Sequence, residues 1–145
     1  TGIRVSVAAA RGLALGLGVP AVGVNLFDVL AFGATGRMLL TLDAPRGAHY
    51  VQTRIDGEIS DIELLPTQDL PNVPGDTQAI GMRSDIVSEA LGLKRVPAVY
   101  SATSAIARVT AERLASGEDI PRHAPLYVRA PDAAPPSDPP PKIIA

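Results

Sequence analysis

The sequence predicts an α/β protein, because helical and extended patterns alternate along the chain. Residues 1–32 have the order helix, strand, helix, and residues 37–55 have the pattern of an antiparallel hairpin. Further helical segments follow at residues 84–92 and 101–116. The chain has 145 residues, which is enough for one domain of ordinary size with a core of its own.

The first segment, residues 1–18, is predicted to be a helix that Thr1 caps and that Gly16 and Gly18 end. Both of its sides are apolar, whereas a surface helix usually has one apolar and one charged side. We expect the bulky side to form the domain's own core and the small-residue side to let another helix approach closely. A helix buried entirely within its own domain is the alternative. The bulky side is Ile3, Val7, Ala10, Ala14 and Leu17, and the small-residue side is Val5, Ala8, Ala9, Gly12 and Gly16.

The next two elements continue the α/β pattern. Residues 19–24 are short, apolar and β-branched, and they predict a buried strand. Asn25 then caps a second, short helix. Asp28 follows three residues later, at the capping-box position where Glu or Gln is usual.

The middle of the chain changes to an antiparallel pattern. Residues 37–42 and 49–55 are predicted to be two strands of a hairpin. The Asp56-Gly57 pair is a strong turn signal, and residues 59–65 are predicted to add a third strand.

The last third of the chain returns to the mixed pattern. Residues 79–82 predict a strand, and Ser84 is expected to cap a helix that ends at Gly92. A further helix spans residues 101–116, and residues 125–129 are expected to be extended. The inward face of that further helix is predicted to be Ile106, Ala107, Thr110 and Leu114.

Composition excludes several classes of protein. The chain has 13 Lys and Arg against 15 Asp and Glu, so it offers no electrostatic basis for direct nucleic-acid binding. It has no cysteine, which excludes a disulfide framework, a thiolate nucleophile and a Cys-ligated zinc site. No apolar stretch is long enough to span a membrane, and Arg4 and Arg11 interrupt any signal-peptide core. We therefore expect a soluble cytoplasmic protein with no membrane contact.

No constellation of residues predicts a catalytic or metal-binding site. His49 and His123 match no metal-binding spacing, and both are expected on the surface. Gly2 could contribute to an anion site at the start of the first helix, although an ordinary N-cap is the simpler interpretation. Asp43 is the one carboxylate that we would test as a metal ligand, although a lone carboxylate opening a turn usually belongs to the turn.

Three segments resemble the bacterial TsaB (YeaZ) family. The longest is TGIRVSVAAARGLALGLGVPAVGVNLFDVLA; LDAPRGAHYVQ is similar to the family's D-A-R-R-x-E-V-Y hairpin, and PLYVR to its C-terminal P-x-Y-[LV]-R. The first match is long and specific, and the two shorter ones follow in the family's order. Pro45 replaces the first Arg of the hairpin turn, and Ala48-His49 replaces Glu-Val.

The resemblance implies an RNase H-like fold of two halves, related to the actin/Hsp70/sugar-kinase superfamily. It also implies a noncatalytic role, without a cofactor, in forming the threonylcarbamoyl modification of adenosine 37 of tRNA. The implied partners are TsaD, bound through the first helix, and the ATPase TsaE in a ternary complex. A homodimer through the same helix is the alternative assembly, and contact with tRNA is expected to be only indirect. The older labels glycoprotease-like and M22 peptidase-like reflect kinship with TsaD, whose HxxxH metal motif is absent from this sequence.

The family pattern also implies a division of the chain. Residues 1–36 are expected to be a remnant of the first half, residues 37–130 the second half, and residues 131–145 a Pro-rich disordered tail. The family's first half begins well before the segment seen here, so we expect this chain to lack the N-terminal part of that half.

The expected contacts with a partner lie on the first helix. Small residues allow close approach, and the arginines can reach carboxylates or carbonyls at the rim. The alternative function is an enzyme of the same superfamily with its own phosphotransfer or M22-like peptidase activity, with Asp43 as its candidate metal ligand. The predicted partner-binding residues are Arg4, Ala8, Arg11, Gly12 and Leu15.

Overall fold

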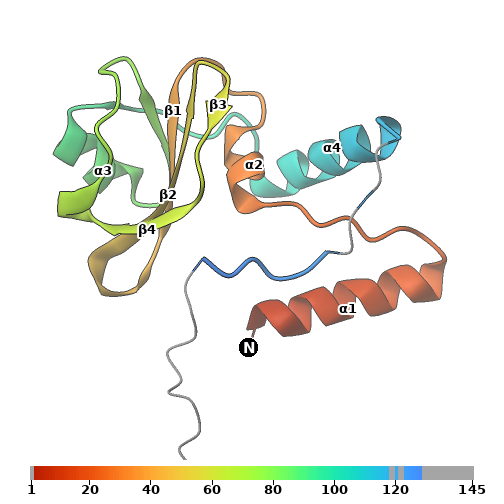
Figure 1. Cartoon of the computed structure of the whole chain (residues 1–145). Helices are drawn as coiled ribbons and strands as arrows, with labels where there is room; N and C mark the ends of the chain where they lie inside the picture. Colours follow the sequence, from red (N-terminus) through yellow and green to blue (C-terminus); the bar gives the residue numbers. More distant parts are fainter. Residues whose placement is uncertain (1, 118–119, 121–122, 129–145) are drawn as a thin grey trace, which may run out of the picture.

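The computed structural model describes residues 2–117, 120 and 123–128. Its centre is a mixed six-stranded sheet of order β3-β2-β1-β5-β6, in which β4 also pairs with β2 (Figure 1). β1 runs antiparallel to β2 and parallel to β5, so a hairpin and a crossover connection share one sheet. The strands are β1 Met38–Asp43, β2 Ala48–Ile55, β3 Glu58–Ile59, β4 Glu63–Pro66, β5 Gln78–Gly81 and β6 Lys94–Arg95, and the helices are α1 Gly2–Leu17, α2 Leu26–Ala31, α3 Ser84–Leu91 and α4 Ala102–Ala115.

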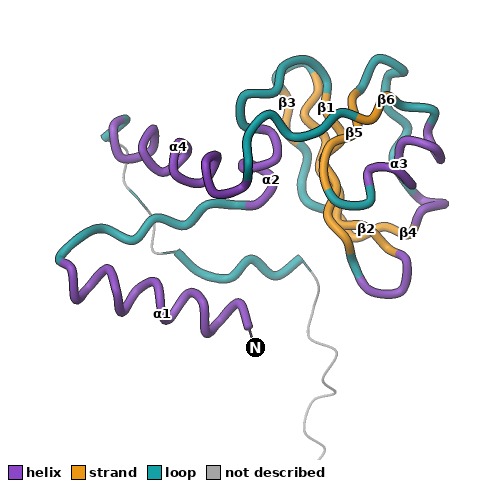
Figure 2. Tube along the Cα trace, turned by 180° about the vertical axis from the view of Figure 1, so that it is seen from behind, coloured by secondary structure: helices purple, strands orange, loops and turns teal. Residues whose placement is uncertain are grey.

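Two hydrophobic cores lie on opposite faces of the sheet. Leu40 and Ile80 pack with Phe27 of α2 on one face. Their neighbours Leu39 and Ala79 belong to the core on the other face, which α3 covers, as the alternation of side chains along a strand requires. Figure 2 shows α2 and α3 on opposite sides of the sheet, with α4 beyond α2. The predicted α/β class is confirmed.

The third expected strand is divided into two. Arg54 of β2 lies opposite Ile59 of β3, whereas Val51 lies opposite Glu63 of β4, so the register shifts by one residue between the two pairs. The additional residue is accommodated in a β-bulge, where the Ser60 hydroxyl accepts a hydrogen bond from the backbone of β2. The single strand predicted here is wrong, because a bulge depends on the partner strand and leaves no local signal.

The turn between β2 and β3 is Asp56-Gly57, as predicted. These residues have φ of 52° and 88°, as a two-residue hairpin turn of type I′ requires. Arg37 donates hydrogen bonds of 2.9 and 3.0 Å to the Asp56 carboxylate and also binds Asp76. The hydrogen bonds from Arg37 hold the pKa of Asp56 below its usual range.

Asp56→Asn should destabilise the fold near neutral pH and have little effect in acid. Asn tolerates the positive φ of this turn, so the substitution removes the charge and preserves the backbone. Because the pKa of Asp56 is lower in the folded chain, its stabilisation is complete above the usual carboxyl pKa and is lost as the pH falls through the lowered value. Urea midpoints of the two proteins should therefore differ at about pH 7 and converge only as the pH falls below the lowered pKa of Asp56. A difference that stays constant with pH would contradict this assignment.

A predicted strand and a predicted helix cap differ from the structure. Residues 19–24 form no strand, because none of the described strands lies alongside them to supply hydrogen bonds. Ser84 is the first residue of α3 and does not cap it; Arg83 precedes it in the left-handed conformation, with φ of 57°. The Ser84 hydroxyl accepts a hydrogen bond from Arg95 instead.

Helix α4 begins as predicted but faces a different way. The Ser101 hydroxyl accepts a hydrogen bond from the backbone of Ser104 and caps the helix. The buried residues are Ala105 and Val109. The predicted inward face is wrong because α4 packs mainly on the short helix α2, which covers only a narrow stripe. Of the predicted residues Ile106, Ala107, Thr110 and Leu114, only Thr110 is half-buried and the rest are exposed.

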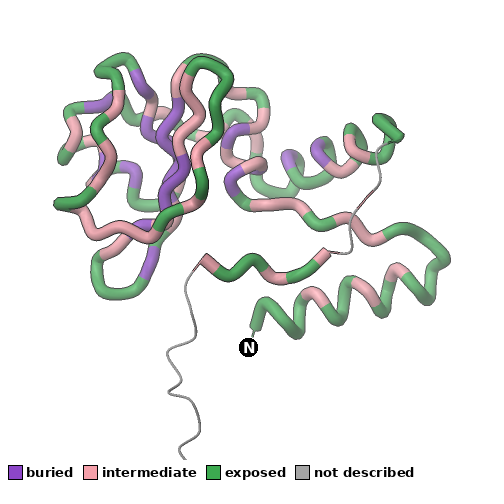
Figure 3. Tube along the Cα trace, viewed as in Figure 1, coloured by how far each residue is buried: buried purple, intermediate pink, exposed green. Residues whose placement is uncertain are grey.

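Helix α1 has the predicted extent, but none of its residues is buried (Figure 3). On the bulky side only Val7 and Ala14 are half-buried, while Ile3 and Leu17 are 59% and 74% exposed. The expectation that this side forms the domain's own core is wrong, because α1 lies apart from the sheet (Figure 1). Although α1 is apolar, no helix among the described residues has the length and hydropathy needed to cross a membrane.

Candidate partner-binding surface on helix α1

Helix α1 presents an apolar surface to solvent. Val5, Leu13 and Leu15 are 62%, 68% and 85% exposed. At Gly12 and Gly16, no atom of the described residues beyond the helix itself lies within 4 Å of the position that a Cβ would take. Monomeric domains rarely expose contiguous apolar surface, and where they do it usually marks an interaction site. Within the described residues, α1 is therefore the candidate functional site.

Of the five residues predicted to contact a partner, four are exposed and Arg11 is half-buried. Ala8 and Gly12 are exposed, and the Leu15 side chain projects into solvent. At 100° per residue these three share one side of the helix, and Arg4 and Arg11 border it. The structure thus leaves the small-residue side of α1 open.

The two arginines bind residues near the other end of the chain. Arg4 Nε donates a 2.7 Å hydrogen bond to the Tyr127 hydroxyl, and its guanidinium lies 5.6 Å from the centroid of that ring. This hydrogen bond raises the pKa of Arg4. Arg11 donates to the backbone carbonyl of His123. Sequence reasoning missed both contacts; the PLYVR motif that contains Tyr127 was their only signal.

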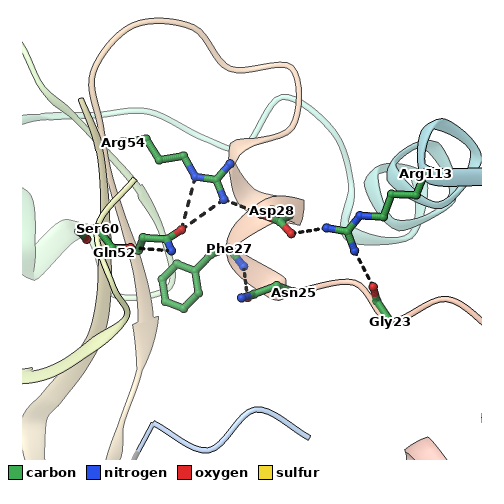
Figure 4. A network of polar contacts seen from close by, with 8 residues as sticks. All are labelled: Gly23, Asn25, Phe27, Asp28, Gln52, Arg54, Ser60 and Arg113. Atoms are coloured by element: carbon green, nitrogen blue, oxygen red, sulfur yellow. Dashed lines mark hydrogen bonds and ion pairs between the residues drawn. The ribbon is translucent and has the colours of Figure 1, made fainter. Parts of the chain in front are cut away.

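A polar network fixes the chain that leads out of α1 (Figure 4). The Asn25 side chain caps α2, as predicted, by accepting a 3.0 Å hydrogen bond from a backbone N–H. Asp28 binds two arginines rather than closing a capping box: its two oxygens accept 2.6 Å hydrogen bonds from Arg54 of β2 and Arg113 of α4. Arg113 also donates to the carbonyl of Gly23, in the segment between α1 and α2.

Asp28→Asn should lower the free energy of unfolding by about 1–2 kcal/mol, measured by urea denaturation. The amide keeps the shape of the carboxylate but removes the charge that both arginines share, and the Arg54 side chain is only 19% exposed. Asp61→Asn is the matched control, because Asp61 is exposed and only its backbone carbonyl makes a described hydrogen bond. Equal effects of the two substitutions would show that the network contributes nothing to stability.

One of the two histidines does not lie where the sequence predicts. His49 is only 2% exposed and lies on β2, with Nε2 3.0 Å from the Thr67 hydroxyl and Nδ1 without a described partner. The predicted surface location of His49 is wrong, because β4 and the turn after it pack over this end of β2. His123 is half-buried.

Asp43 and Gly2 remain isolated from other candidate groups. Asp43 ends β1 and lies 3.8 Å from Arg83, with both side chains 53% exposed. Gly2 begins α1, and its carbonyl accepts a hydrogen bond from the Ser6 hydroxyl. Among the described residues, no three His, Asp or Glu side chains are grouped so that they could hold a metal ion.

Comparisons with known proteins identify the family. A family model described as TsaD, tRNA N6-adenosine threonylcarbamoyltransferase, matches residues 1–120. No curated protein matches the sequence. A solved structure described as an uncharacterized protein with similarity to peptidase YEAZ from Pseudomonas aeruginosa has a TM-score of 0.64 at 21% identity, over 88% of this chain and 68% of that chain. YeaZ from Pseudomonas aeruginosa has a TM-score of 0.65 at 22% identity, over 87% and 68%.

These structural matches confirm the RNase H-like α/β fold that the resemblance implies. The family model covers most of the chain, including all the described helices and strands. The chain therefore belongs to the family described as TsaD, tRNA N6-adenosine threonylcarbamoyltransferase, and it has the fold of YeaZ.

Proposed function

We propose that this chain is a TsaB-like, noncatalytic subunit that binds TsaD through α1 and tunes it in forming the threonylcarbamoyl modification of adenosine 37 of tRNA. Family membership supports a place in this tRNA modification system. The observation that carries the partner role is the apolar surface of α1, where Leu15 is 85% exposed and no residue is buried. Burial of such a surface drives association.

The small-residue side of α1 suits a helix as the partner element. Glycines inside a helix each cost about 1 kcal/mol of propensity, and Gly12 and Gly16 pack against none of the residues that the structure describes. Close approach of a second helix would offset that cost, because the absent side chains let two backbones come together. Ala8 and Leu15 would then flank the crossing point.

The rest of the proposal follows from charge and from the resemblance. The chain's formal net charge is −2, so tRNA would contact it only indirectly, within the complex. TsaE would join the pair of TsaB-like chain and TsaD in a ternary complex, and the assembly would work in the cytoplasm. Residues 1–36 would be a remnant of the first RNase H-like half and residues 37–130 the second half, while the expected Pro-rich tail, residues 131–145, lies outside the described residues.

Size-exclusion chromatography with light scattering tests the partner role. The chain, the TsaD protein of the same organism and their mixture are run separately, and a one-to-one complex is expected in the mixture. A dimer of this chain that ignores TsaD would make a second copy the occupant of α1. A monomer in every run would overturn the proposal.

A further inference from the structure

Residues 123–128 lie between α1 and the rest of the molecule (Figure 1). On one side they meet α1, where Arg4 binds the Tyr127 hydroxyl and Arg11 binds the His123 carbonyl. On the other side, Leu126, Tyr127 and Val128 line an open surface pocket of about 500 Å³ together with Asn25, which caps α2, and residues of the bulged sheet edge such as Gln52 and Ser60. We call residues 123–128 the strap.

The strap also passes tightly over the segment that connects α1 to α2. A Cβ built at Gly23 would lie 2.7 Å from the Cβ of His123, so only glycine fits beneath the strap. The carbonyl of the same Gly23 accepts a 2.5 Å hydrogen bond from Arg113 of α4. The strap thus packs on the segment between α1 and α2, and that segment is itself hydrogen-bonded to α4.

Helix α1 has few other attachments among the described residues. None of its residues is buried, and among the described residues its side-chain hydrogen bonds to distant parts of the chain are the two to the strap. An isolated helix of 16 residues is only marginally stable in water, and internal glycines weaken it further. Without the strap, α1 would fray and lose its orientation.

We propose that the strap holds α1 in a fixed orientation for its partner, with Arg4 and Arg11 as positioning residues rather than partner contacts. The strap does not compete with the partner, because it binds the arginine side of α1 and leaves Ala8, Gly12 and Leu15 exposed. The identity of that partner rests on the proposed function. The claim that the strap fixes the orientation of α1 does not depend on that function.

Hydrogen exchange of the isolated chain of residues 1–145, read by mass spectrometry, tests the structural part. Tyr127→Phe removes the hydroxyl that accepts from Arg4 and keeps the ring, so exchange of residues 2–17 should become about fivefold faster. Gly23→Ala should have the same effect, because the added methyl group displaces His123 without altering α1 or Tyr127. Tyr100→Phe is the matched control: Tyr100 packs on Phe32 and Arg108, which belong to neither α1 nor the strap, and the substitution should leave the exchange of α1 unchanged.

If the exchange of α1 were unchanged in both Tyr127→Phe and Gly23→Ala, the proposal that the strap holds α1 in place would be overturned. Affinity for TsaD, measured with the same proteins, separates the two proposals. Faster exchange in α1 together with weaker TsaD binding by the variants would support both. If exchange were faster in the variants but the wild-type chain did not bind TsaD, the proposed role of the strap would stand and TsaD would be excluded as the partner. Faster exchange with unchanged TsaD affinity would overturn the claim that the strap orients α1 for that partner.

Discussion

Gly81→Ala is expected to lower the free energy of unfolding by about 3–5 kcal/mol, enough to unfold a marginal domain. Gly81 ends β5 with φ of 122°, a conformation that side chains rarely adopt. A Cβ at this position would collide with the backbone carbonyl of Thr41 in the neighbouring strand β1. That carbonyl cannot move away, because it accepts a 2.9 Å hydrogen bond from Met82 while the Thr41 hydroxyl donates to the Met82 carbonyl at 2.6 Å.

Urea denaturation followed by circular dichroism measures this effect, and Gly75→Ala is the matched control. Gly75 lies in the loop before β5, has open space where its Cβ would be and has no positive φ, so its substitution should change stability by less than about 0.5 kcal/mol. If Gly81→Ala unfolded at the urea concentration of the wild type, the close approach of β5 and β1 described above would be incorrect.

Strand β5 could be predicted from the local sequence pattern, whereas the strain at its last residue, Gly81, could not. Most of β5, both strands of the β1–β2 hairpin and the four helices follow from apolar spacing, caps and the Asp56-Gly57 turn, which are properties of short segments. The strain at Gly81 and the bulge at Ser60 depend on which strand lies alongside. Strand pairing joins residues distant in sequence, so no local window contains that information.

The same distinction applies to the candidate site. The two apolar sides of α1 are visible in the sequence because a helix repeats every 3.6 residues. The sequence does not show which side of α1 faces the rest of the molecule, because Arg4 and Arg11 bind residues more than 100 positions away. The role of Asp28 was misassigned for a similar reason: its spacing from Asn25 suggests a capping box, whereas its partners come from β2 and α4.

Gly12→Leu is expected to weaken TsaD binding by about 30-fold, which corresponds to about 2 kcal/mol, in a calorimetric titration. The added isobutyl group would stand where, in the proposed complex, a partner helix approaches closely. The isolated chain should be as stable as the wild type or slightly more stable, because Gly12 has open space around it and leucine favours a helix over glycine. The same side chain placed on the exposed face of α4, as Ala107→Leu, should leave both affinity and stability nearly unchanged.

The interpretation depends on comparing the affinity of the Gly12→Leu chain for TsaD with its stability to unfolding. A Gly12→Leu chain that binds TsaD as tightly as the wild type would move the partner surface away from the small-residue side, to the face that carries Leu13 and Leu17, which are 68% and 74% exposed. Loss of folding together with loss of binding would mean that the small-residue side belongs to the chain's own core. Only weakened binding by a stable chain supports a docking helix, because an exposed glycine that contributes nothing to its own fold then matters to a second molecule.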